Sequence, residues 1–135
     1  MSDIKTKKPS PSLDAWLKEA KAHVSAGKIG MYLIHNGVVR ETARAVVREG
    51  AENKSAVTGM YFSYDEEKVN AAIKEAEALP GIGYIKVWLN EGELTAGDDI
   101  MYVLVGGDIR PRVIDALQSL VAKIKNECVV EQEKY

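Results

Sequence analysis

Two apolar stretches between residues 84 and 105 dominate the hydrophobic pattern of this chain of 135 residues. Residues 84–89 alternate as a β-strand does, because every second side chain of a strand faces the same side. In residues 100–105 both alternating sets are apolar, which predicts a central strand covered on both faces. Between them, residues 90–99 hold turn formers and four carboxylates around one apolar residue, Leu94. We therefore expect two strands joined by a turn.

Three other segments repeat apolar residues with the 3.6-residue period of an α-helix. The predicted helices cover residues 12–27, 63–79 and 111–127. Ser12 is the expected N-cap of the first helix. At the second, Ser63 and Glu66 form a capping-box pattern, with Asp65 as a rival cap. Pro111 opens the third helix, because proline is tolerated in the first turn.

The apolar faces of these helices predict core positions. Val24 belongs to the face of the first helix and Leu79 to that of the second. Cys128 continues the stripe of the third helix, so we interpret it as a small core residue rather than a reactive thiol. His23 lies near the first stripe and is interpreted as a boundary histidine.

Further strands are expected at residues 29–39, 43–47 and 55–62. The order is then helix, three strands, helix, two strands, helix, which favours a single α+β domain with a mostly antiparallel sheet and three helices. That domain is expected to span residues 12–128. Residues 1–11, polar, lysine-rich and interrupted by prolines, are expected to form a disordered N-terminal tail. Residues 129–135 are expected to form a C-terminal tail.

Composition and charge exclude several classes of function. The formal net charge of −2 gives no support for a surface that binds nucleic acid or an anionic membrane. The single cysteine excludes an internal disulfide and favours a reducing compartment. No apolar run approaches the roughly 18 residues that a membrane-spanning helix needs. No apolar signal core is present near Met1, so a cytoplasmic protein is expected.

The turn between the two strands also carries a family resemblance. Its residues Gly92-Glu93-Leu94 and Gly97-Asp98 precede a hydrophobic strand, and a short loop with Arg110 then leads into a helix. This arrangement resembles the large, catalytic subunit of molybdopterin synthase, and the resemblance extends more weakly over residues 12–125. It implies an α/β-hammerhead-like fold and a symmetric homodimer.

The resemblance also implies a reaction and a partner. Enzymes of this family insert two sulfurs into a cyclic pyranopterin monophosphate, and the sulfur arrives as a C-terminal thiocarboxylate on a small ubiquitin-like subunit. By the family pattern, Arg40 and Arg110 would bind the anionic substrate, since the planar arginine fork suits a phosphate. Lys125 would be the catalytic lysine that moves protons or holds a developing charge. We expect these three cations around one cleft. No metal or other cofactor is expected.

The chain departs from the family pattern in the loop after Arg40, where residues 42–47 replace an Asn- and Gly-containing loop, and at three single positions. His35 stands where the family has an aromatic residue, five positions before Arg40. Ile109 replaces a histidine, and Gln132 replaces a second catalytic lysine, for which Lys134 is the nearest substitute.

Two functions therefore remain open. One is a molybdopterin synthase large subunit with weakened activity. The other is a non-catalytic relative that serves as a dimeric binding or assembly module, or, more remotely, a small ligand-sensing domain.

Overall fold

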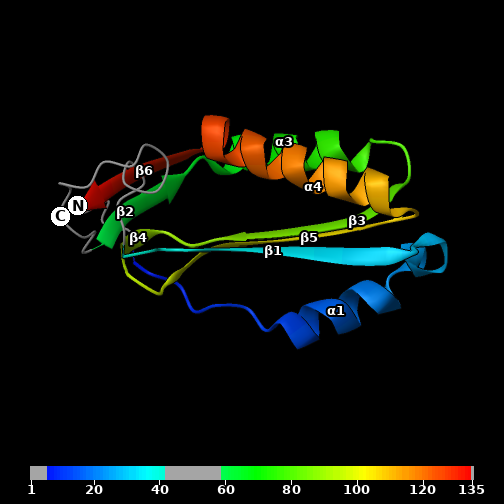
Figure 1. Ribbon diagram of the computed structural model, residues 1–135, viewed down its shortest axis with the longest axis horizontal. Helices are drawn as coiled ribbons and strands as arrows, with labels where there is room; N and C mark the ends of the chain where they lie inside the picture. The colour runs from blue at the N-terminus through cyan, green and yellow to red at the C-terminus, as the bar shows by residue number, and fades with distance from the viewer. Residues whose placement is uncertain (1–5, 42–58, 135) are drawn as a thin grey trace.

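A three-stranded antiparallel sheet forms the centre of the computed structural model, which describes residues 6–41 and 59–134. Its strands lie in the order β1 (Met31–Val38), β5 (Asp99–Gly107) and β3 (Ile82–Leu89). A second antiparallel sheet has the order β4 (Gly92–Thr95), β2 (Gly59–Tyr64) and β6 (Val129–Lys134). It lies at one end of the first sheet, on the left in Figure 1. The predicted α+β class, with mostly antiparallel strands, is confirmed.

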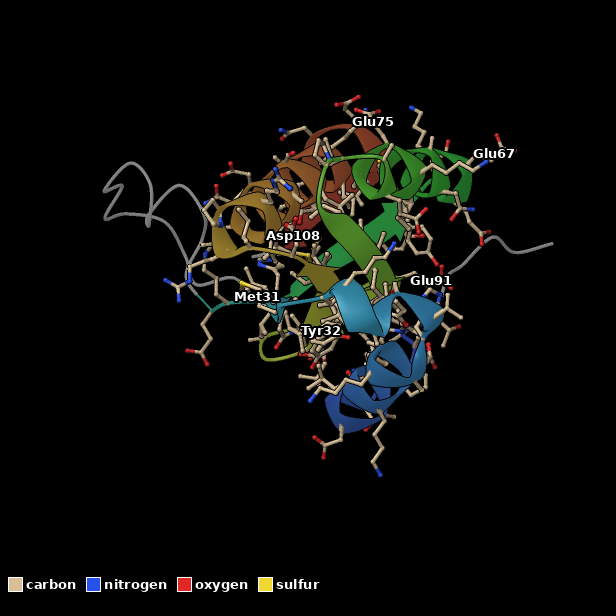
Figure 2. All side chains as sticks on the ribbon, turned by 90° about the vertical axis from the view of Figure 1, so that its right-hand side faces the viewer. Met31, Tyr32, Glu67, Glu75, Glu91 and Asp108 are labelled. Atoms are coloured by element: carbon tan, nitrogen blue, oxygen red, sulfur yellow. The ribbon has the colours of Figure 1, made fainter. Side chains whose placement is uncertain are left out.

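Helices cover both faces of the first sheet. Helices α3 (Glu66–Glu77) and α4 (Arg110–Lys123) lie on one face, and α1 (Leu13–Ala22) lies on the other (Figure 1). Figure 2 shows the same three layers end on, with α3 and α4 above the sheet and α1 below it. Two short turns complete the described elements: a 3₁₀ turn, η1 (Val24–Lys28), and a π-helical turn, η2 (Ile124–Cys128).

Strand β5 divides the core into two parts, as its two apolar faces predict. One alternating set packs beneath α3 and α4, and the other packs with α1. The first set is Met101, Val103 and Val105, and the second is Tyr102 and Leu104. The adjacent residues Met31 and Tyr32 of β1, both labelled in Figure 2, likewise pack against different parts of the core. The prediction of a central strand covered on both faces is confirmed.

Local capping signals explain where two helices begin. The Ser12 side chain accepts a hydrogen bond from the backbone N–H of Ala15, as predicted. The cap of α3 is Asp65, whose carboxylate accepts from the backbone N–H of Lys68, so the rival cap is the correct one and Ser63 is not.

Two predicted core positions are wrong. Val24 is 97% exposed, because the chain turns to extended backbone at His23 and α1 ends before Val24 can join its apolar face. Leu79 is 40% exposed because α3 ends at Glu77.

Three differences concern strands. Leu94 lies in strand β4 rather than in an open turn, where it is buried and pairs with Met60 of β2. The C-terminal segment expected to be a tail instead forms β6, which pairs antiparallel with β2. Strand β2 overlaps the predicted segment 55–62, extends beyond it to Tyr64, and is described only from Gly59. The strand expected at 43–47 lies outside the described residues.

The described part of the N-terminal segment, residues 6–11, is attached to the domain rather than disordered. The backbone N–H of Lys8 donates to the side-chain oxygen of Asn90 at 2.8 Å. The Lys8 ammonium donates to the Tyr64 hydroxyl at 3.0 Å, and Lys7 forms a 3.0 Å ion pair with Asp98. These contacts join a segment without secondary structure to β2 and to the connections before β4 and β5.

The turn of residues 92–98, which carries the family resemblance, needs glycine at two positions because of its backbone geometry. Gly92 and Gly97 have φ angles of 86° and 91°, which side chains of other residues disfavour. The Gly97 N–H donates to the Val39 carbonyl at 2.8 Å, and the Val39 N–H donates to the Asp98 carbonyl at 2.9 Å. The turn therefore fixes the end of β1, immediately before Arg40.

Replacing Gly97 by alanine tests this requirement. We expect Gly97→Ala to lower the free energy of unfolding by about 1–2 kcal/mol, because a side chain strains left-handed backbone. A clash is not the cause, since a Cβ at Gly97 would meet no atom within 4 Å. Gly27 has the same open surroundings without a positive φ, so Gly27→Ala is the matched control and should not destabilise. Equal urea-unfolding curves for the two variants would contradict the expectation.

Candidate functional site

Lys125 lies in the π-helical turn that follows α4. Helix α4 ends at Lys123, and the five residues of η2 widen the next turn. Ile124 and Cys128 of this turn are buried, whereas Lys125 is exposed. Single π-helical turns occur frequently at functional sites. The turn therefore presents the predicted catalytic lysine to solvent while its neighbours anchor it in the core.

His35 of β1 is close enough to Lys125 for the positive charge of the lysine to act on its imidazole. It is half-buried and pairs in register with Val103 of β5. Met31 and Leu33, which alternate with it along β1, pack against the part of the core beneath α3 and α4. Its side chain is thus on the face of the sheet that α4 covers. Burial lowers the pKa of His35, and the positive charge of Lys125 lowers it further, so the imidazole is neutral at neutral pH.

Gly37 leaves space beside the His35 ring. A Cβ placed at Gly37 would lie 3.6 Å from Nε2 of His35 and 3.2 Å from Cγ of Met101. The second distance is tighter than an ordinary contact, so even a methyl group would press on Met101. The absence of a side chain here keeps the Nε2 edge of the ring uncrowded.

Arg40 lies beyond the same end of β1. Its predecessor Val39 is buried and held by the two hydrogen bonds of the Gly97-Asp98 turn. The Asp98 carboxylate accepts from the Thr95 backbone N–H at 2.8 Å, which is the main reason that its pKa is lowered. Arg40 itself is exposed, so a rigid turn supports a cation that faces solvent.

Arg110 lies at the opposite end of the molecule. It is the first residue of α4, on the right in Figure 1, whereas Lys125 follows the left end of the same helix. At 1.5 Å per residue, the distance from residue 110 to residue 125 is roughly 20 Å. The ends of β1 and α4 that precede Arg40 and Lys125 therefore lie at one end of the molecule, and the start of α4, with Arg110, lies at the other (Figure 1). The expectation that the three predicted cations surround one cleft of a single chain is not met.

The two other departures from the family pattern, Ile109 and Gln132, lie far from each other. Ile109 is 52% exposed and precedes α4 beside Arg110, without a side-chain cap for the helix. Gln132 lies on β6, exposed and paired with Tyr61. Neither side chain exchanges protons near neutral pH.

His35 is the functional candidate that residue patterns alone did not identify. The sequence indicates only that His35 stands where the family has an aromatic residue. The alternation of β1 contained a signal, since it puts His35 and Gly37 on one face, but the approach of Lys125 depends on the packing of α4.

Two other kinds of functional feature, a metal-binding cluster and a membrane-spanning helix, are absent from the described residues. No group of three His, Cys, Asp or Glu side chains there could hold a metal ion. None of the helices in the described ranges combines the length and apolar character needed to cross a membrane.

Comparisons with known proteins agree with the fold. A family model described as MoaE protein matches residues 12–127. A molybdopterin synthase structure from Staphylococcus aureus superposes with a TM-score of 0.72 at 15% identity, covering 100% of this chain and 93% of that one. A MoaE protein from Burkholderia ambifaria MC40-6 gives 0.71 at 19% identity, with 99% and 88% covered.

A third structure is a complex of subunits 1 and 2 of the molybdopterin-converting factor from Helicobacter pylori 26695. It gives a TM-score of 0.65 at 16% identity, covering 96% of this chain and 83% of that one. At such identities these likenesses concern the fold. No curated protein sequence matches the chain.

The reactivity of the Cys128 thiol tests whether the π-helical turn η2 is closed in solution. Its side chain is buried, and burial, followed by the charge of Glu127, raises the pKa of its thiol. The thiolate is the reactive form, so we expect slow labelling by a thiol reagent at neutral pH in the native protein. The urea-unfolded chain should label rapidly and serves as the control. Since the chain has one cysteine, equal rates in the two states would show directly that η2 is open.

Proposed function

Because the chain belongs to the MoaE protein family, we propose that it is the large subunit of a molybdopterin synthase. In this role it transfers sulfur from a thiocarboxylated small subunit to a cyclic pyranopterin monophosphate during molybdenum cofactor biosynthesis. The observation that carries the proposal is that the π-helical turn with Lys125 follows α4 at the same end of the fold as the end of β1 that precedes Arg40 (Figure 1). The single cysteine supports a cytoplasmic location for this activity.

The two cations have different roles in this proposal. Arg40 binds the substrate phosphate, because a guanidinium remains charged and offers two parallel donors to an anion. Lys125 donates a proton or holds the negative charge that develops on the reacting atoms. The buried neighbours of Lys125 and the turn behind Arg40 support both groups on rigid backbone.

A second copy of the chain accounts for Arg110. One chain cannot bring Arg110 to Lys125, since α4 separates them. In a symmetric dimer, however, Arg110 of one protomer would reach the site of its partner, and the same contact would occur twice. We therefore propose a homodimer in which each substrate is bound by residues of both protomers.

The small subunit is the other proposed partner. The structurally similar complex from Helicobacter pylori contains two subunits of a molybdopterin-converting factor, which supports a two-subunit assembly for this chain too. The sulfur carrier would have to bring its C-terminus to the end of the fold where Lys125 lies.

Ile109 and Gln132 favour a second candidate function. Neither replaces the proton exchange of the histidine and lysine that the family resemblance implies at these positions. A non-catalytic dimer that keeps the scaffold and binds or assembles partners would retain Arg40 without needing a fast reaction. For the enzyme, the same two residues imply slow conversion, since loss of one proton-transfer group typically reduces a rate about 10²–10⁴-fold.

Conversion of the pyranopterin precursor by the wild-type chain and a thiocarboxylated small subunit decides between the two. We expect slow conversion, which Lys125→Ala should abolish. Lys74→Ala, an exposed lysine on α3, is the matched control and should leave the rate unchanged. Absence of wild-type conversion would favour the non-catalytic module, and conversion that survives Lys125→Ala would exclude the role given to Lys125.

Restoring the missing lysine is a separate test. Gln132→Lys adds a proton-exchanging group on β6 and should raise the rate of conversion. The increase should be at most about 10²–10⁴-fold, which is typical of one such group, and should be larger the closer β6 comes to the substrate. Gln118→Lys makes the same chemical change on the exposed side of α4 and should have no effect. A rate that Gln132→Lys does not raise would show that slow turnover has another cause.

Mixing two inactive variants tests the shared site. Arg110→Ala and Lys125→Ala should each be inactive as homodimers. After subunit exchange, random pairing in a symmetric dimer should restore about one quarter of the wild-type sites, each with one intact arginine and one intact lysine. A mixture no more active than its components would exclude a site that spans two protomers.

A further inference from the structure

His35 and Lys125 form a pair of unlike bases at the proposed site. The imidazole is half-buried on the α4 face of β1, and the ammonium is on the exposed side of η2. Gly37 keeps the Nε2 edge of the ring uncrowded. Burial of the ring together with a nearby cation favours an uncharged imidazole. One member of the pair can therefore accept a proton while the other still has one to donate.

We propose that His35 is the proton acceptor of the sulfur transfer and that Lys125 is the proton donor. The proposal rests on the function proposed above and adds to it a residue that the family pattern does not include. His35 stands in place of an aromatic residue, and an aromatic ring of carbon atoms exchanges no protons. The chain thus contains its own substitute for the groups missing at Ile109 and Gln132.

The proton balance of the cleavage step requires one acceptor and one donor. The step starts from a thioester in which the transferred sulfur is already bonded to both the acyl carbon of the carrier and a carbon of the substrate. A water oxygen bonds to the acyl carbon, and the bond between that carbon and the sulfur breaks. His35 Nε2 takes one proton from that water, and the Lys125 ammonium gives one proton to the departing sulfur. The carrier ends as a carboxylic acid and the substrate as a thiol. The imidazolium then returns its proton to the Lys125 amine, and both groups recover their starting states.

The surroundings of His35 make Lys125 its main charged neighbour among the described residues. From β5, its partner Val103 and the partner of Gly37, Met101, lie on the same face, and both are apolar. The stripe of α4 that packs on this face of the sheet is also apolar, including Leu117 and Val121. Lys125 is the charged group whose field acts on the ring. Removing that one charge should therefore change the titration of His35.

Nuclear magnetic resonance of the imidazole protons tests the pairing without any activity. The chain has two histidines, and His23 is exposed and hydrogen-bonded to Ser25, so it provides an internal reference. We expect the pKa of His35 to rise in Lys125→Met. Lys74→Met, on α3, is the matched control and should leave that pKa unchanged. A pKa of His35 that is the same in Lys125→Met and in the wild type would overturn the pairing.

Rates of conversion test the proton acceptor itself. His35→Phe restores the family's aromatic residue and should keep the fold, and His35→Gln keeps a polar group that accepts no proton at neutral pH. Each variant should convert the precursor about 10²–10⁴-fold more slowly, with little change in substrate affinity. Because the acceptor must be neutral, the wild-type rate should fall as the pH drops through the pKa of His35. That acidic limb should be absent in His35→Phe.

The outcomes separate this inference from the proposed function. An active wild type with an equally active His35→Phe would overturn the role of His35 and leave the synthase function intact. A wild type that converts nothing would overturn the synthase function and the proton acceptor with it, even if the titration shows that the two bases are coupled. A slowed His35→Phe without the acidic limb supports both.

Discussion

Burial of β5 on both faces is the constraint on which the rest of this structure depends. Six consecutive residues of this strand, Ile100 to Val105, are apolar or aromatic and lie in the core, so each face needs its own cover. Helices α3 and α4 supply one cover and α1 the other. Each well-buried side chain of this size contributes about 1.5–3 kcal/mol, so an uncovered face would not be stable in water. The direction of α4 across the sheet, and with it the separation of Arg110 from Lys125, follows from this arrangement.

Predictions from sequence succeeded where the cause is local. The two apolar faces of β5, the cap at Ser12 and the proline at the start of α4 are each encoded within a few residues. The π-helical turn was not predictable from the stripe, because a four-residue spacing such as Ile124 to Cys128 is compatible with either helix. Strand β6 depends on its partner β2, and its own polar residues give no strand pattern. Family resemblance grouped Arg110 with Lys125, but only the folded chain reveals the distance between them.

The Gly92 to Asp98 turn shows how a recognisable motif can be unrelated to chemistry. Its glycines meet a requirement of backbone conformation, and its hydrogen bonds to Val39 fix the end of β1. These requirements of the backbone do not depend on any reaction. The motif therefore identifies the scaffold, whereas the proposed reaction concerns His35, Ile109 and Gln132.

The attachment of residues 7 and 8 has a consequence for how the domain responds to salt. Lys8 lies over the rings of Tyr64 and Trp88, at 5.1 Å and 5.6 Å from their centroids, and these rings belong to different sheets. The segment therefore links the two sheets through one side chain. Its outer contact, the ion pair of Lys7 with Asp98, is solvent-exposed and weakens as salt screens it, whereas the partly buried Lys8 contacts are screened less. Rising ionic strength therefore weakens the link of Lys7 to Asp98 before it weakens the contacts of Lys8 to the two sheets.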